Sequence, residues 1–399
     1  MTTQMTSLST PYEIIIVGAR VAGAGLALQT ARAGLRTLVI DRDPPGRDTL
    51  STHAMMRGGV MILNRWGLLS RIEELDTPAI RQTTFHYGEA SFPVFIKERG
   101  GVDALYSPRR YVLDRILAEA AADAGAEVLH RTRFEDVLRD GRGRVCGIRM
   151  TGPDGVSHSV SGSLVVGADG IDSRVAAACG SGILHQGRNR SGVIFSYWKN
   201  IPLDGTHWFY GPQSAAGAIP TNGGCCVFTS FRPERLEGIK PSALPRLFQE
   251  VLSEVNPDFA AYLRHGSLDG GYIKFGGRSG FMRQISGPGW ALVGDAACFK
   301  DPITAHGMTD ALRDASELAR AVVRGTPQAW QEWESGHERF ARAFVDLSDR
   351  IAAYRMPLPE LQAAHKDLSR LMNEECDYIE RGEAGSFAEQ PALAMAVND

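Results

Sequence analysis

The 399 residues include no apolar run of the roughly 20 residues that a membrane-spanning helix requires. The first ten, MTTQMTSLST, lack the basic start and apolar core of a secretion signal, so we expect a cytoplasmic protein without membrane insertion. A net charge of −3 offers no basic surface for nucleic acid. The six cysteines are then expected to be free thiols, and no His and Cys spacing resembles a metal site.

A buried strand, a glycine turn, a helix and a second strand follow one another near the start of the chain. The strand Ile14–Val17 is apolar on both faces, as in the centre of a covered parallel sheet. Gly18 allows a tight turn, and Gly23 lets the next helix lie close to the sheet. The start of such a helix attracts a pyrophosphate. Asp41 follows Gly18 by 23 residues, near the roughly 20 expected of the acid that holds a ribose hydroxyl.

Arg20 departs from this dinucleotide pattern, because it stands at the second glycine of G-x-G-x-x-G. The backbone is then expected to lie farther from the phosphate, and the guanidinium itself becomes a candidate phosphate ligand. The alternative is a helix–strand crossover that binds nothing. The residues expected at the dinucleotide are Gly18, Arg20, Val21, Ala22, Gly23, Asp41 and Arg42.

The rest of the chain predicts an α/β unit interrupted by a second sheet. Helices are expected at 58–75, 110–124, 245–255, 307–324 and 328–373, the last with a break at Pro357 and Pro359. Buried strands are expected at 164–166 and 290–293. Between residues 192 and 277, short strands separated by Gly, Pro and Asn turns predict a largely antiparallel sheet. Such an insertion implies a ligand cleft between two layers.

Four separated motifs carry a family resemblance when they are read in order. They are the turn at 18–25; RYVLDRIL at 110–117, similar to R-x-x-L-x-x-x-L; GADGIDSRV at 167–175, similar to G-A-D-G-x-x-S-x-V-R; and GDAA at 294–297 followed by Pro302 and Gly307, similar to G-D-A-A-H-x-x-x-P-x-x-G-x-G, in which Ala305 replaces the first glycine after the proline. The chain resembles the class A flavin-dependent monooxygenases, the aromatic hydroxylase group that shares the para-hydroxybenzoate hydroxylase fold. The resemblance covers roughly residues 12–324.

The resemblance implies a domain plan. A Rossmann-like FAD-binding domain, of the glutathione reductase and para-hydroxybenzoate hydroxylase type, would carry an inserted, mostly antiparallel substrate sheet and a C-terminal helical tail. The FAD-binding domain is then expected at residues 11–82, 100–180 and 285–340, the substrate domain at 83–99 and 181–284, and the helical region at 341–399. The tail either packs on the first domain or forms a homodimer contact.

The resemblance also implies an activity. NAD(P)H and O2 would be used to hydroxylate or otherwise oxygenate a small apolar or aromatic compound through a flavin C4a-hydroperoxide. NAD(P)H would bind transiently, which agrees with the lack of a second glycine fingerprint. Beyond the first turn, the expected FAD contacts are Arg110, Asp169, Gly294, Asp295, Pro302, His306, Gly307 and Met308. The catalytic candidates are His53 and Arg57, in the loop that lies near the active site in this family, and His306, which would touch the flavin or the substrate.

Several of these residues have structural alternatives. Asp295 is expected to accept hydrogen bonds from the ribityl chain, or else to cap a helix. Asp169 contacts the cofactor or stabilises its own turn. His53 and His306 are catalytic groups or surface histidines. Aromatic residues of the inserted sheet, of which alternation sends about half toward the cleft, are Tyr197, Trp198, Trp208, Phe209 and Tyr210.

Other features leave the reaction open. Cys298, Ala305, His306 and Thr309 depart from the family pattern and indicate an outlying branch. The halogenase pattern G-W-x-W-x-I-P is missing, so halogenation is not expected. The first rival is an FAD-dependent oxidoreductase without oxygen insertion: an oxidase, a dehydrogenase or a double-bond reductase like geranylgeranyl reductase. The second is a non-catalytic flavoprotein that senses nucleotide occupancy.

Overall fold

The computed structural model describes residues 11–49 and 51–382, so the expected N-terminal tail and residues 383–399 of the expected helical region lie outside it. One half is an eight-stranded sheet with the main order β16-β17-β8-β1-β2-β5, and the β6–β7 hairpin extends from β8. Its strands are β1 (Tyr12–Val17), β2 (Thr37–Ile40), β5 (Glu127–Leu129), β6 (Arg133–Arg139), β7 (Val145–Thr151), β8 (Ser157–Gly167), β16 (Ser286–Gly287) and β17 (Trp290–Leu292). The predicted central strand lies between β2 and β8, parallel to both.

Helix α1 (Val21–Arg32) packs against α4 (Arg110–Asp123) and α8 (Gly307–Arg324). The turn before α1 requires its glycines: Gly18 has a φ of +109°, and a Cβ on Gly23 would lie 1.8 Å from the carbonyl oxygen of Gly18. Close approach of α1 to β1 therefore depends on Gly23. The short helix α5 (Arg174–Cys179) follows β8.

The other half is a seven-stranded sheet with the order β14-β10-β13-β12-β11-β3-β4. Its strands are β3 (Gln82–Tyr87), β4 (Ala90–Phe95), β10 (Gly192–Lys199), β11 (Thr206–Tyr210), β12 (Ser214–Thr221), β13 (Gly224–Phe231) and β14 (Ser267–Phe275). One face packs on α6 (Leu244–Val255) and α7 (Pro257–Leu263), and the opposite face packs on the C-terminal helices. All its strand pairs are antiparallel except β11 with β3, so the expected inserted sheet has one parallel joint.

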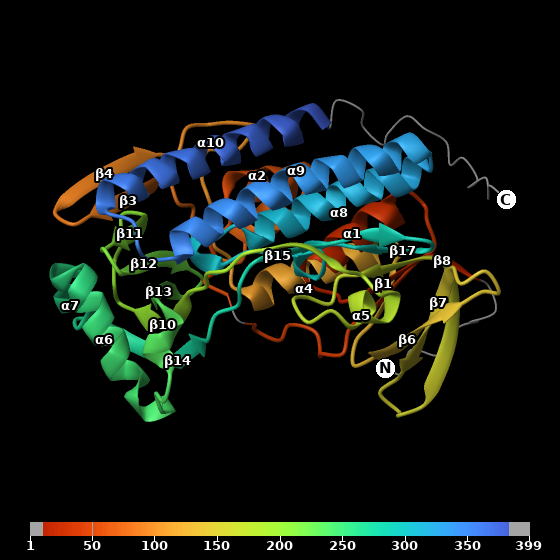
Figure 1. The fold of residues 1–399 in the computed structure, drawn as a ribbon, viewed down its shortest axis with the longest axis horizontal. Helices are drawn as coiled ribbons and strands as arrows, with labels where there is room; N and C mark the ends of the chain where they lie inside the picture. The colour runs from red at the N-terminus through yellow and green to blue at the C-terminus, as the bar shows by residue number, and fades with distance from the viewer. Residues whose placement is uncertain (1–10, 50, 383–399) are drawn as a thin grey trace.

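The C-terminal helices α9 (Pro327–Ala352) and α10 (Leu358–Gly382) run across both halves (Figure 1). Arg99 ties α10 to the first half of the chain by contacts with Asp377 and Glu380. α9 continues through the domain boundary expected at residues 340–341, because its buried face runs unbroken from Trp333 to Ile351. No helix of the described residues is long and apolar enough to cross a membrane.

Local structure differs from expectation at residues 58–75. Two helices replace the single predicted one: α2 (Arg57–Arg65) and α3 (Leu69–Glu73). Gly67 between them has a φ of +72°, which ends the first helix in the way that glycine commonly does. A small third sheet, β18-β15-β9, joins β9 (Ile183–Gln186), β15 (Phe281–Arg283) and β18 (Cys298–Phe299) between the two halves.

Candidate active site

A cavity of about 690 Å³ lies between the two large sheets. Because β1, β2, β8 and β17 are parallel, their carboxyl ends all meet at its wall, where ligands of such sheets bind. The predicted contacts that line it are Gly18, Arg20, Val21, Ala22, Asp41, Arg42, Arg110, Asp169, Asp295, Pro302, His306, Gly307 and Met308. Gly23 and Gly294 support the wall from behind: Gly294 donates its N–H to Asp314 at 3.1 Å.

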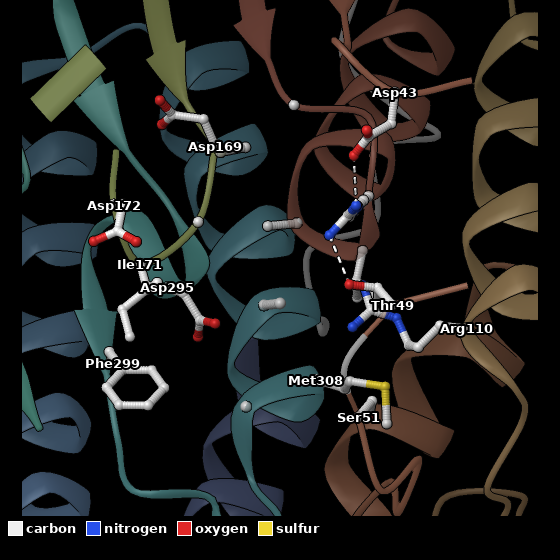
Figure 2. A pocket seen from close by; sticks show the side chains of 18 of the residues that line it. Asp43, Thr49, Ser51, Arg110, Asp169, Ile171, Asp172, Asp295, Phe299 and Met308 are labelled. Carbon is white, nitrogen blue, oxygen red and sulfur yellow. Dashed lines mark hydrogen bonds and ion pairs between the residues drawn. The ribbon is translucent and has the colours of Figure 1, made fainter. Parts of the chain in front are cut away.

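Two sides of the cavity face each other in Figure 2. Thr49, Ser51, Arg110 and Met308 lie on one side, and Asp169, Asp295 and Phe299 lie on the opposite side. Thr49 and Met308 lie on the same side although they are 259 residues apart in the sequence. The four motifs read from the sequence thus converge on one elongated space.

The acid and the arginine near the first turn hold the chain around them. Asp41 accepts hydrogen bonds from the N–H groups of Ala19 at 2.7 Å and Asp43 at 2.8 Å. The guanidinium of Arg20 contacts the carboxylate of Asp43 at 2.7 Å and the hydroxyl of Thr49 at 2.9 Å. Arg20 therefore fastens the loop after β2 to the start of α1 while its side chain stays 37% exposed at the cavity.

Arg110 and Asp169 are also held by protein partners. Arg110 makes a two-pronged contact with Asp114, one turn along α4, at 3.1–3.2 Å. Asp169 accepts from the hydroxyl of Ser173 and from the backbone N–H of Arg174 at 2.7 Å, so its carboxylate caps the start of α5. The turn-stabilising alternative therefore accounts for the bonds of Asp169, although the residue still lines the cavity.

Asp295 differs from the other acids of the wall, because its carboxylate makes no hydrogen bond with the described residues and is exposed to the cavity. Its place deep between the sheets removes bulk water and raises its pKa to about 6, an effect that the positive charges of Lys300 and Arg110 oppose. A carboxylate in this position is free to accept hydrogen bonds from a hydroxyl-rich ligand.

The loop from Pro302 brings the start of α8 to the cavity. Ala305 has a φ of +50°, the left-handed conformation that glycine adopts without strain. This conformation explains why the family pattern has glycine there. Gly307 and Met308 form the first turn of α8 at the wall, so free N–H groups and the positive end of the helix dipole face the cavity.

The imidazole of His306 points behind the wall, although the residue lines it. This side chain is fully buried, stacks on Phe344 of α9 with ring centres 4.0 Å apart, and places Nε2 2.8 Å from the carboxylate of Glu375 on α10. The part of His306 that borders the cavity is therefore not its imidazole ring. The structure brings the residue to the site without presenting its ring to a ligand.

A buried ionic cluster lies around His306. Arg313 contacts Glu375, Asp310 and Asp314, while Lys300 pairs with Asp310. Burial alone would raise the pKa of Asp314, but His337, Arg313 and Lys300 hold it well below the ordinary value. The cluster, which no motif in the sequence reveals, joins α8 to α9 and α10 directly behind the cavity wall.

The other two catalytic candidates lie outside the cavity wall. His53 is fully buried with a φ of +67°, and its Nε2 makes a short hydrogen bond with the hydroxyl of Tyr197. Burial and the charges of Arg109 and Arg110 hold the pKa of His53 well below its ordinary value, so the ring is neutral. Arg57 donates to the backbone carbonyl of Lys97 at 2.6 Å.

An apolar chamber forms one end of the cavity and was not singled out from the sequence. Its side chains are those of Val193, Phe195, Phe275 and Phe299, and the rings of Phe275 and Phe299 are 6.4 Å apart. The available signal was alternation along β10, because Val193, Phe195 and Tyr197 share one face of that strand. None of the five aromatics singled out on the inserted sheet, at 197–198 and 208–210, lines the cavity.

These features fit FAD. The start of α1 suits a pyrophosphate, and the start of α8 suits a flavin ring that gains negative charge on reduction. The free carboxylate of Asp295 and the apolar end of the cavity complete the site. A family model described as FAD binding domain matches residues 11–346. The chain belongs to this family. Its members bind FAD, and the chain is an FAD-dependent oxidoreductase, as the sequence motifs predict.

Curated relatives carry different activities. A digeranylgeranylglycerophospholipid reductase from Methanothrix thermoacetophila is 24% identical over 374 residues, which are 90% of each chain. The FAD-dependent monooxygenase nodM from Hypoxylon pulicicidum is 30% identical over 174 residues, 42% of this chain and 36% of that protein.

Solved structures share the fold. The flavin-dependent brominase Bmp2 has a TM-score of 0.77 at 17% identity, covering 96% of this chain and 100% of that one. PqsL, a probable FAD-dependent monooxygenase from Pseudomonas aeruginosa, has a TM-score of 0.74 at 18% identity, covering 90% and 100%. The para-hydroxybenzoate-hydroxylase type of fold predicted from the sequence is confirmed.

Proposed function

We propose that the protein is an FAD-dependent reductase of carbon–carbon double bonds in an apolar, isoprenoid-like compound, with NAD(P)H as the source of electrons. The apolar chamber carries this proposal. Three phenylalanines and a valine form its side chains, and a substrate there would be held by burial of apolar surface, worth about 25 cal/mol per Å².

Two of the polar groups near the chamber are already engaged by the protein. Asp301 accepts hydrogen bonds from the backbone N–H groups of Ser191 at 2.7 Å and Ile303 at 3.0 Å. Lys300 pairs with the buried Asp310. Neither group is free to act on a phenol, as an aromatic hydroxylase would need, whereas an unsaturated hydrocarbon needs no such partner.

The part of the cavity opposite the apolar chamber would orient the cofactor. The start of α1, Asp41 and Asp295 would hold the nucleotide and ribityl parts of FAD, and the start of α8 would favour negative charge next to the chamber by about 0.3–2 kcal/mol. FAD, when bound, supplies two-electron transfer. The chain's own contribution is to hold an apolar substrate beside the cofactor and exclude water.

The relatives support the reductase over the oxygen insertion that the motif resemblance implies. Besides the protein from Methanothrix, a digeranylgeranylglycerophospholipid reductase from Methanopyrus kandleri is 25% identical over 373 residues, 88% of this chain and 91% of that protein. Monooxygenase action on an apolar compound is the second candidate. It is favoured by the match to nodM and by the same water-excluding chamber.

The two candidates differ in their need for oxygen. The FAD-loaded protein is reduced without air by light and a sacrificial electron donor, and geranylgeraniol is added as an apolar alkene probe. A reductase re-oxidises its flavin without oxygen and yields a product with two additional hydrogens. A monooxygenase leaves the flavin reduced until air is admitted, and its product gains one oxygen atom. A flavin that stays reduced without air, together with a probe that is unchanged in both arms, would contradict both proposals.

A further inference from the structure

A pair of histidines lies at the one parallel joint of the seven-stranded sheet, apart from the FAD cavity. His86 on β3 and His207 on β11 approach each other with Nε2 of His86 3.1 Å from Nδ1 of His207. Both residues are partly exposed, and their rings are inclined by 18°. Phe209 stacks on His86 with ring centres 4.6 Å apart, which restrains the orientation of that ring.

The outer nitrogens of the pair have fixed partners. Nε2 of His207 lies 2.7 Å from the carboxylate of Asp204, and Nδ1 of His86 lies 2.8 Å from the hydroxyl of Ser91. A carboxylate only accepts, so the outer nitrogen of His207 carries the proton and its inner nitrogen has a free lone pair. The serine hydroxyl can donate or accept, so His86 can carry its proton on either nitrogen.

This tautomer choice gives the pair two states. With the proton on Nε2, His86 donates to His207. With the proton on Nδ1, His86 donates to Ser91, and two unprotonated nitrogens face each other.

We propose that His86 and His207 together bind one divalent transition-metal ion, of which Zn²⁺ is the test case, with water completing its coordination. At Zn–N bonds of about 2.0–2.1 Å, two ligands at tetrahedral or right-angle positions lie about 2.9–3.4 Å apart. The observed 3.1 Å falls within this range. Imidazole nitrogen favours zinc, copper and nickel over magnesium or calcium.

The surroundings match those of histidine ligands. A ligating histidine usually donates its other N–H to a carboxylate or similar group, which fixes the tautomer and strengthens the ligand. Asp204 serves His207 in this way, and Ser91 serves His86. The ion would connect β3 to β11, two strands separated by more than 110 residues of sequence, at the joint where the sheet changes from antiparallel to parallel.

The buried cluster behind the cavity is a weaker metal candidate. Ligand atoms of His306, Asp310 and Glu375 lie within 4.8 Å of one another. Lys300 and Arg313 already supply positive charge to these carboxylates. A divalent cation would have to displace or oppose both buried cations, which the histidine pair on the sheet does not require.

The test is calorimetric titration of the EDTA-treated, FAD-loaded protein with Zn²⁺. One ion per chain is expected at the pair. His86→Gln and His207→Gln should each weaken this binding more than tenfold, and Asp204→Asn by about 10- to 100-fold. His185→Gln is the matched control, because His185 pairs with Asp346 at 2.6 Å at a separate surface position. Its binding should equal that of the unchanged protein.

A second readout is thermal unfolding. Zn²⁺ should raise the unfolding temperature of the unchanged protein and of His185→Gln, but not that of His86→Gln, since binding to the folded form alone stabilises it. Retention of the flavin spectrum shows that each variant is folded. Absence of Zn²⁺ binding in the unchanged protein, or binding that survives both histidine substitutions, would overturn the proposal.

Discussion

Substitution of Gly23 by alanine tests how the protein holds the phosphates of FAD. The new Cβ would lie 1.8 Å from the carbonyl oxygen of Gly18, and an ordinary contact is at least 3.4 Å, so backbone must separate by about 1.6 Å. The obstacle is backbone, so no side-chain rotation relieves it. Such overpacking costs about 1–3 kcal/mol. We expect the dissociation constant for FAD to rise by roughly 5- to 150-fold, because α1 moves away from the phosphates.

The assay is fluorescence titration of flavin-free protein with FAD. Gly141→Ala is the matched control, since a Cβ there meets no atom within 4 Å and the residue lies in the turn between β6 and β7. Circular dichroism shows whether the Gly23→Ala variant is folded. A folded Gly23→Ala variant that binds FAD within twofold of the unchanged protein would refute the close-packed turn as the basis of phosphate binding.

Three further predictions concern stability. Ala305→Gly should raise the free energy of unfolding by about 0.5–1 kcal/mol, since relief of the left-handed strain exceeds the entropy cost of glycine; an unchanged or lower thermal midpoint would contradict this. Glu375→Gln should lower the free energy of unfolding, measured by urea titration, by about 3 kcal/mol, because Arg313 loses a buried partner. Substitution of the exposed Glu374 by glutamine should change the free energy of unfolding by under about 1 kcal/mol. Because folding lowers the pKa of Asp314, its carboxylate stabilises the folded protein at pH values above the ordinary pKa of 3.8, and this stabilisation is lost progressively at lower pH. Between pH 4 and pH 2, the free energy of unfolding should therefore fall less in Asp314→Asn than in the unchanged protein.

The parts of the site that depend on local backbone chemistry could be predicted from the sequence. Gly18 and Gly23 are needed because a side chain at either position would clash with nearby backbone, and the presence of glycine in the sequence already indicates this requirement. Asp295 follows a buried strand, so its place at the carboxyl edge of a parallel sheet also follows from the pattern.

The parts that depend on tertiary packing could not be predicted. The ring of His306 turns behind the wall because Phe344 and Glu375, 38 and 69 residues farther along the chain, surround it. Its place in the loop gave no sign of this. His53 likewise looked like a loop residue near the flavin, but its partner Tyr197 comes from the inserted sheet. Side-chain direction in both cases is set by elements that the local sequence does not contain.

The cofactor site requires that four distant segments of the chain bind one FAD. The most direct measurement is the flavin content of the purified protein, with rebinding of FAD after its removal. We predict a yellow protein that releases one FAD per chain on denaturation and, once stripped, quenches the fluorescence of added FAD at one equivalent. A correctly folded protein that is colourless and leaves the fluorescence of added FAD unchanged would contradict the account.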